Sequence, residues 1–135
     1  MVTYEILPDQ SLTIVRYAGT ITFDQIVSTQ RAYLADPCYV VGTPELAIFE
    51  DAEQLDFDYQ SINLLTTVLT NAYKANDARP TISILAPKDL PYGLSRIFQS
   101  VAEYRKSMNV MVHRTEKSAL AWLGRNEVSI SELPR

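Results

Sequence analysis

Residues 87–96 combine basic, hydroxyl-bearing and glycine residues at the predicted start of a helix. Because an apolar, strand-like run precedes them, free backbone amides and the positive end of the helix should meet there. Ligands of open α/β sheets tend to bind beyond the carboxyl ends of the strands. A phosphate-bearing ligand or a partner's carboxylate would suit this place. The candidate anion site consists of Lys88, Gly93, Ser95 and Arg96.

The same segment also has a purely structural interpretation. Asp89 can cap the helix and occupy the amides that an anion would need. No glycine-rich nucleotide-binding motif is present in the sequence. A structural turn is therefore the alternative to a ligand site.

Charge is divided unevenly along the chain. No lysine or arginine occurs between Ala32 and Tyr73, whereas residues 74–125 hold nine basic and four acidic residues. Complementary charge accelerates encounter, so the acidic stretch predicts a docking face for a basic partner. A solvated loop is the alternative, and the spacing of a calcium-binding loop is missing. The candidate docking face consists of Glu50, Asp51, Glu53, Asp56 and Asp58.

Residues that commonly perform catalysis are scarce and scattered. His113 is the single histidine and Cys38 the single cysteine, and neither stands in a recognisable motif. Catalysis generally needs a positioned acid–base pair, an activated nucleophile or a metal ion. We therefore expect no catalytic residues, no metal site and no cofactor.

Composition narrows the class of protein. A chain of 135 residues fits one domain. The net charge of −4 argues against binding to nucleic acid or to anionic membranes. No stretch approaches the roughly 20 apolar residues that span a bilayer, and the first residues do not resemble a secretion signal. We expect a cytoplasmic protein that binds neither nucleic acid nor membrane.

Hydrophobic periodicity predicts alternating strands and helices. Apolar runs and period-two patterns predict strands at residues 2–7, 12–18, 45–50, 81–86 and 109–114. Thr22 and Gln25 match a capping box for a first helix that stops at Asp36-Pro37. Further helices are expected after Asp58, from 94 to 105 and from 115 to 123.

The order β-β-α-β-α-β-α-β-α predicts an α/β fold with one mixed sheet. An antiparallel hairpin should open it, parallel βαβ units should follow, and the helices should pack on the sheet around one core. We expect residues 1–124 to form the domain. Residues 125–135 should be a tail that lies on the surface or frays.

Several local patterns resemble the SpoIIAA-like family, which has the STAS fold (sulfate transporter and anti-sigma-factor antagonist). Their order and spacing extend from Tyr4 to Gly124. The resemblance implies a small, non-catalytic regulatory module that binds a protein partner or itself. The matching residues are Gly19, Asp36-Pro37, 92–98, 112–114 and 119–124.

The resemblance also suggests a phosphorylation site. Well-studied STAS proteins are switched by phosphorylation of a serine in an Asp-Ser pair at the start of the second helix. That pair is missing here, and Ser61 lies within a residue or two of the equivalent place. The alternative is that Ser61 only satisfies backbone amides in the first helical turn.

Two functions follow from these observations. The first is a regulatory or protein-interaction module of the STAS-like type. The alternative is a protein that binds or senses an anionic or apolar small molecule near residues 88–96, between the third helix and the sheet.

Overall fold

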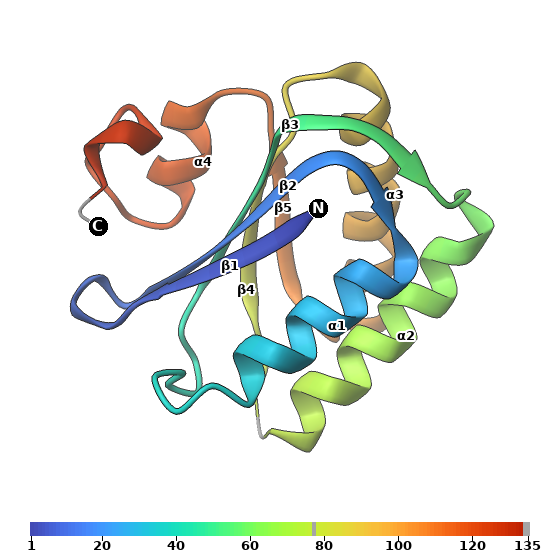
Figure 1. Ribbon diagram of the computed structural model, residues 1–135, viewed down its shortest axis with the longest axis horizontal. Helices are drawn as coiled ribbons and strands as arrows, with labels where there is room; N and C mark the ends of the chain where they lie inside the picture. Colours follow the sequence, from blue (N-terminus) through green and yellow to red (C-terminus); the bar gives the residue numbers. More distant parts are fainter. Residues whose placement is uncertain (77, 134–135) are drawn as a thin grey trace.

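The computed structural model describes residues 1–76 and 78–133, and its centre is a five-stranded sheet in the order β1-β2-β3-β4-β5 (Figure 1). The first two strands pair antiparallel, and each later pair is parallel. This confirms the predicted mixed sheet. The strands are β1 (Val2–Leu7), β2 (Leu12–Thr22), β3 (Glu45–Asp56), β4 (Thr81–Leu85) and β5 (Asn109–His113).

The helices cover both faces of the sheet. In Figure 1, helices α1 to α3 lie on one face, and α4 with the C-terminal segment lies on the other. The chain order of strands and helices is the predicted one, with short 3-10 turns at Pro8–Gln10 and Ile130–Glu132. None of the described helices is both long and apolar enough to cross a membrane. The helices are α1 (Phe23–Leu34), α2 (Gln60–Ala75), α3 (Asp89–Arg105) and α4 (Glu116–Trp122).

The central strands are apolar on both faces, and this corrects the expectation of one core. Val15, Ala47 and Ile84 belong to a cluster under α1, α2 and α3. Their neighbours Ile14, Leu46 and Leu85 belong to a second cluster under α4. Successive side chains of a strand point to opposite faces, so a strand without polar alternation needs cover on both sides.

Strands β2 and β3 run further than the sequence predicted. We expected them to end at residues 18 and 50, but they extend to Thr22 and Asp56. The register shifts twice in the extension, before and after Ala18-Gly19, and Gly19 has a φ of +68°. Glycine adopts this left-handed conformation at little cost, so it bends the strand at a bulge instead of ending it. The acidic stretch therefore lies largely on a strand and not in a loop.

The predicted capping box at the start of α1 is confirmed. Thr22 Oγ1 accepts the Gln25 N–H at 3.2 Å, and Gln25 Oε1 accepts the Thr22 N–H at 3.0 Å. The end of α4 also agrees with the sequence, because Gly124 has a φ of +79° in the left-handed region that favours glycine after a helix.

The described part of the tail packs on the α4 side of the sheet. Arg125 donates to the backbone oxygen of Gln10 at 3.2 Å and pairs with Glu127 at 2.7 Å. Leu133 is buried in the second cluster. Residues 125–133 thus add cover to this face.

We predict that Thr22→Ala lowers the free energy of unfolding by about 1 kcal/mol, within the roughly 0.5–2 kcal/mol typical of lost N-caps. The alanine leaves the Gln25 N–H without its side-chain acceptor. Urea unfolding monitored by circular dichroism measures the change. Thr20→Ala, at an exposed strand position, serves as the control. Equal losses in both variants would contradict a capping contribution.

Candidate functional site

The four residues of the predicted anion site do not gather around one point. Lys88 is the N-cap residue of α3, and its Nζ donates to the backbone oxygen of Ala52 on β3 at 3.4 Å. Ser95 is buried and lines a cavity, whereas Arg96 is exposed. Gly93 is exposed and lies in the first turns of the helix, where a Cβ would meet nothing within 4 Å. Anion binding here stays a prediction.

Asp89 does not cap α3 as the structural alternative supposed. The helix start has no side-chain cap, and the Asp89 carboxylate instead pairs with Arg114 at 2.8 Å. The Arg114 guanidinium also lies over the Tyr92 ring, 4.0 Å from its centroid. The cation and the aromatic ring attract each other, so this contact links the start of α3 to the end of β5.

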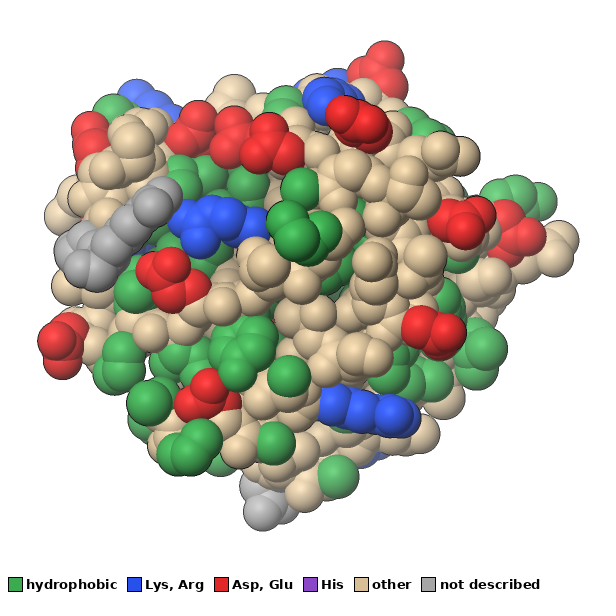
Figure 2. Space-filling view, in the orientation of Figure 1, with side chains coloured by type: hydrophobic (Ala, Val, Ile, Leu, Met, Phe, Trp, Pro, Cys, Tyr) green, Lys and Arg blue, Asp and Glu red, His purple; other side chains and the backbone are tan. Residues whose placement is uncertain are grey.

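The acidic residues occupy the carboxyl-terminal half of β3 and the segment before α2. Asp51, Glu53, Asp56 and Asp58 are exposed. Glu50 is half-buried; burial raises its pKa, and the carboxylates of Glu116 and Asp51 raise it further. Figure 2 shows acidic side chains along the upper edge of the molecule, over the bend of β3. A basic partner as the occupant stays a prediction.

Ser61 lies in the first turn of α2, one residue after its first residue, Gln60. A cap at Asp58 is the natural expectation for a helix that follows it, but the N-cap residue is Tyr59, one position later. The Asp58 carboxylate nevertheless accepts the Ser61 N–H and the Ser61 hydroxyl, each at 3.0 Å. These hydrogen bonds lower the pKa of Asp58. The Ser61 hydroxyl therefore lies beside both the amides of the helix start and the Asp58 carboxylate. This position fits a phosphorylation site and a purely structural residue alike.

The histidine and the cysteine lie far apart in the chain and in different surroundings. His113, at the end of β5, is buried, and its Nδ1 lies 2.8 Å from Ser118 Oγ. Burial lowers the pKa of His113. Cys38 is exposed after α1. Within residues 1–76 and 78–133, no group of three or more His, Cys, Asp or Glu could hold a metal ion.

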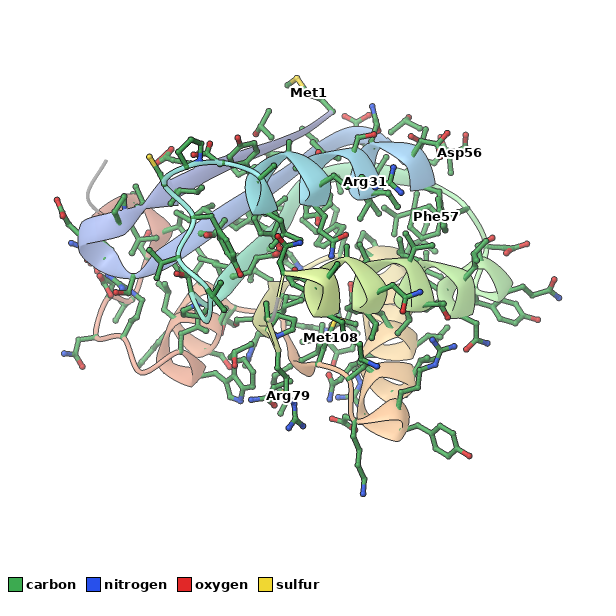
Figure 3. All side chains as sticks on the ribbon, turned by 90° about the horizontal axis from the view of Figure 1, so that it is seen from below. Met1, Arg31, Asp56, Phe57, Arg79 and Met108 are labelled. Carbon is green, nitrogen blue, oxygen red and sulfur yellow. The ribbon has the colours of Figure 1, made fainter. Side chains whose placement is uncertain are left out.

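A cavity lies between the sheet and helices α1, α2 and α3. The space open to the centres of water-sized molecules is about 70 Å³. Most of its wall is apolar, with contributions from β2, β3, β4 and all three helices. Among the described residues that line it, Thr29, Phe57 and Leu94 are only half-buried, so the cavity comes nearest to solvent beside them. Figure 3 shows Phe57 between α1 and α2, near the start of α2.

One end of the cavity is polar because three elements bring polar side chains together. Glu45 begins β3, Tyr33 lies near the end of α1, and Tyr73 lies near the end of α2. Glu45 Oε1 accepts from the Tyr33 hydroxyl at 2.5 Å and from the Tyr73 hydroxyl at 3.1 Å. The two hydroxyls also contact each other.

Glu45 is a charged residue inside an apolar layer. Glu45 is only 7% exposed. Among the described residues that line the cavity, no other is an Asp, Glu, Lys, Arg or His. Burial raises the pKa of Glu45, and the hydrogen bonds from Tyr33 and Tyr73 lower it in part. Burial also raises the pKa of both tyrosines, and the nearby Glu45 adds to that rise. Both phenols therefore stay protonated and can act as donors at neutral pH.

Gln30, which lines the cavity three residues before Tyr33 on α1, adds an unused acceptor. Its Nε2 donates to the backbone oxygen of Leu69 on α2 at 3.0 Å, which fixes the orientation of the amide. Its Oε1 is buried and has no hydrogen-bond partner in the described structure. Such a group costs about 1–3 kcal/mol when it stays unsatisfied, so a hydrogen-bond donor in the cavity would be favoured at this oxygen.

Sequence reasoning missed this polar end. The sequence places Glu45 at the start of a predicted strand, and nothing local to Tyr33 or Tyr73 links either tyrosine to it. The available signal was spacing: Gln30 and Tyr33 are three residues apart within the apolar stripe of α1, and polar residues on such a stripe need a partner. A small ligand was expected between α3 and the sheet, and residues of α3 and of the strands form part of the cavity wall.

We predict that Glu45→Gln increases stability relative to the wild type, and that the difference grows as the pH rises. Burial raises the pKa of Glu45 in the folded state, so the wild type is stabilised below the pKa of the unfolded chain and loses that stability as the pH rises through the folded pKa. The glutamine oxygen can still accept from both tyrosines, but it carries no charge.

Chemical unfolding of both proteins between about pH 4 and pH 8, the range around the usual glutamate pKa, measures the difference. Glu53→Gln, at an exposed position of β3, is the matched control and should show no such growth. A difference that stayed constant across this range would contradict the effect of burial.

The arrangement of strands and helices is similar to that of a known protein. A solved structure titled "Structure of the Anti-Sigma Factor Antagonist SpoIIAA in its Unphosphorylated Form" superposes with a TM-score of 0.53 and 16% sequence identity. The match covers 92% of this chain and 98% of that one. No family model matches the sequence, and no curated protein does so either. The five-stranded mixed sheet and its helices, together with this likeness, show that the chain has the SpoIIAA-like STAS fold.

Proposed function

We propose that this chain is a non-catalytic regulatory module that acts by binding another protein. The observation that carries the proposal is the likeness to the anti-sigma factor antagonist SpoIIAA over 92% of the chain. The split charge of the sequence supports it as well, because an acidic face and a basic remainder favour recognition by charge. A cytoplasmic location and self-association stay predictions.

The surface we assign to the partner runs from β3 to α2. We call it the β3–α2 face and define it by Asp51, Glu53, Asp56, Asp58 and Ser61. Its carboxylates are exposed and suit a basic partner.

Apolar residues beside the β3–α2 face strengthen the assignment. Tyr59 and Leu64, at the start of α2, are 61% and 59% exposed. Protein interfaces combine such apolar and aromatic anchors with a polar rim. Glu50 contributes less to this surface, because it is half-buried and lies beside Glu116.

Phosphorylation of Ser61 would change this surface strongly. The hydroxyl now donates to Asp58 Oδ1. A phosphate cannot make that bond and adds close to two negative charges beside a carboxylate, while the free amides at the start of α2 attract it. The result would be a rearranged and more acidic helix start, which is how a modification at this place could switch partner binding.

We predict that Ser61→Asp weakens binding to an anti-sigma factor by about tenfold or more, equal to roughly 1.4 kcal/mol, because repulsion from Asp58 rearranges the helix start and this loss of fit exceeds the added attraction to a basic partner. Ser61→Ala should bind nearly as the wild type does, because it adds no charge. Isothermal titration calorimetry with purified anti-sigma factors from the same cell measures both variants, and the affinity should fall as salt is added.

Ser100→Asp provides the matched control for Ser61→Asp. Ser100 is an exposed serine on α3 and lies outside the β3–α2 face. Binding of no anti-sigma factor at all, or equal weakening by both aspartate variants, would contradict the proposal.

A second candidate function is the binding of a small molecule in the cavity, and the specific observation in its favour is the unpartnered Oε1 of the buried Gln30. A cavity of about 70 Å³ has room for on the order of five water-sized groups. Its apolar wall and few polar groups resemble ligand sites in general.

We predict that small apolar molecules perturb methyl NMR signals of one face of the sheet only. Leu65, Leu69 and Ile82 line the cavity and should shift during titration with cyclopentane or xenon. Leu12 and Leu120, on the opposite face, are the internal control. Absence of shifts, or equal shifts on both faces, would count against a ligand in the cavity.

A further inference from the structure

The polar end of the cavity has more free hydrogen-bond acceptors than free donors. A phenol carries one hydrogen, a carboxylate carries none, and an amide nitrogen carries two. The Tyr33 and Tyr73 hydrogens point to Glu45 or to each other, and one of the two Gln30 amide hydrogens is donated to Leu69. Apart from the second Gln30 amide hydrogen, what remains free at this end is acceptor capacity.

Two of the free acceptors come from different elements. Both tyrosines contact Oε1 of Glu45, so Oε2 is left to accept from another group. Gln30 Oε1 is the second; Gln30 is only 3% exposed, and this oxygen has no partner in the described structure. The orientation of the amide cannot be reversed without loss of the bond to Leu69, so Oε1 stays an acceptor.

Charge narrows the choice of ligand further. No lysine or arginine of the described chain forms an ion pair with Glu45. A buried carboxylate without a cation is costly, and a carboxylate or phosphate ligand would add a like charge. An alcohol would donate one hydrogen bond and leave the charge uncompensated. An ammonium group supplies both the positive charge and up to three donors.

We propose that the cavity binds a small apolar amine, with its ammonium group on Glu45 and Gln30 and its hydrocarbon part along the apolar wall. This inference rests on the second candidate function, ligand binding in the cavity. The hydrocarbon part extends toward the half-buried residues Phe57 and Leu94, at the carboxyl ends of the strands. The available space suits a ligand with on the order of five to seven non-hydrogen atoms.

A matched series of ligands tests the class of head group. The probes are n-pentylamine, 1-pentanol and pentanoate, which share a chain and differ in the head group. Their affinities are measured by calorimetry at pH 7 and, site by site, by methyl NMR. We expect pentylamine to bind at least tenfold more tightly than pentanol, and pentanoate to bind more weakly than either.

Substitutions at the polar end test the residues. Glu45→Gln should remove the preference for pentylamine and leave the affinity for pentanol within about twofold. Gln30→Met should reduce pentylamine affinity while keeping the volume of the side chain, and it provides an independent readout if Glu45→Gln does not fold. Glu53→Gln, on the exposed part of β3, should change nothing.

The outcomes separate the two levels of the inference. Tighter binding of pentanol or pentanoate than of pentylamine, with shifts confined to cavity methyl groups, would overturn the amine assignment and leave the cavity as a ligand site. An amine preference that survived both Glu45→Gln and Gln30→Met would also overturn it. No binding by any probe, apolar ones included, would overturn ligand binding in the cavity itself.

Discussion

The placement of Glu45 inside the layer between sheet and helices is the constraint around which this face of the molecule is arranged. Its carboxylate accepts hydrogen bonds from the hydroxyl groups of Tyr33 and Tyr73, so β3, α1 and α2 meet at this point. An isolated buried carboxylate would be very costly, and the phenols repay part of that cost only if both helices hold their position along the strand. The contact therefore specifies how α1 and α2 lie relative to the sheet more than it adds stability.

The same constraint explains why a cavity persists in an otherwise well-filled core. The side chains that contact Glu45 are those of Tyr33 and Tyr73, and their hydroxyl groups approach the carboxylate. Tyr17 and Phe49 stack beneath them on the sheet, with ring centroids 4.0 Å apart. Because hydrogen bonds to Glu45 fix the polar ends of Tyr33 and Tyr73, neither ring can move into the cavity without loss of its hydrogen bond. On the opposite face, where α4 covers Ile14, Leu46 and Leu85, the buried Ser83 hydroxyl donates to the backbone oxygen of Ala119 at 2.8 Å, and this contact involves no carboxylate.

Local patterns in the sequence were sufficient for the element order and the mixed sheet. The Thr22–Gln25 capping box and Gly124 each act within one or two helical turns, so their residue types alone predicted their roles. The extensions of β2 and β3 could not be predicted in this way. They depend on pairing between residues more than 30 positions apart, and Gly19 fits both the end of a strand and a bulge.

The same difference between local patterns and long-range contacts separates the candidate sites. The acidic residues and Ser61 could be proposed from the sequence because charge and helix position are visible in one segment. The cluster of Glu45, Tyr33, Tyr73 and Gln30 could not be, because Glu45, Tyr33 and Tyr73 lie 12 to 40 residues apart in pairs and touch only after α1 and α2 pack on the sheet. Conversely, Ser95 and Arg96 are adjacent in the sequence, yet one is buried and the other exposed. Adjacency along a helix places neighbours about 100° apart and does not bring them to one ligand.

The two proposed functions meet in a single segment of the chain. Phe57 lines the cavity, and its neighbours Asp56 and Asp58 belong to the β3–α2 face. A ligand that fixed the Phe57 ring would also fix the backbone that presents these carboxylates and Ser61. Linkage then requires reciprocity: whatever factor the ligand adds to partner affinity, the partner adds to ligand affinity. Because α2 carries Ser61 near one end and Tyr73 near the other, the helix runs from one proposed site to the other, and the polar contact at Glu45 holds its far end.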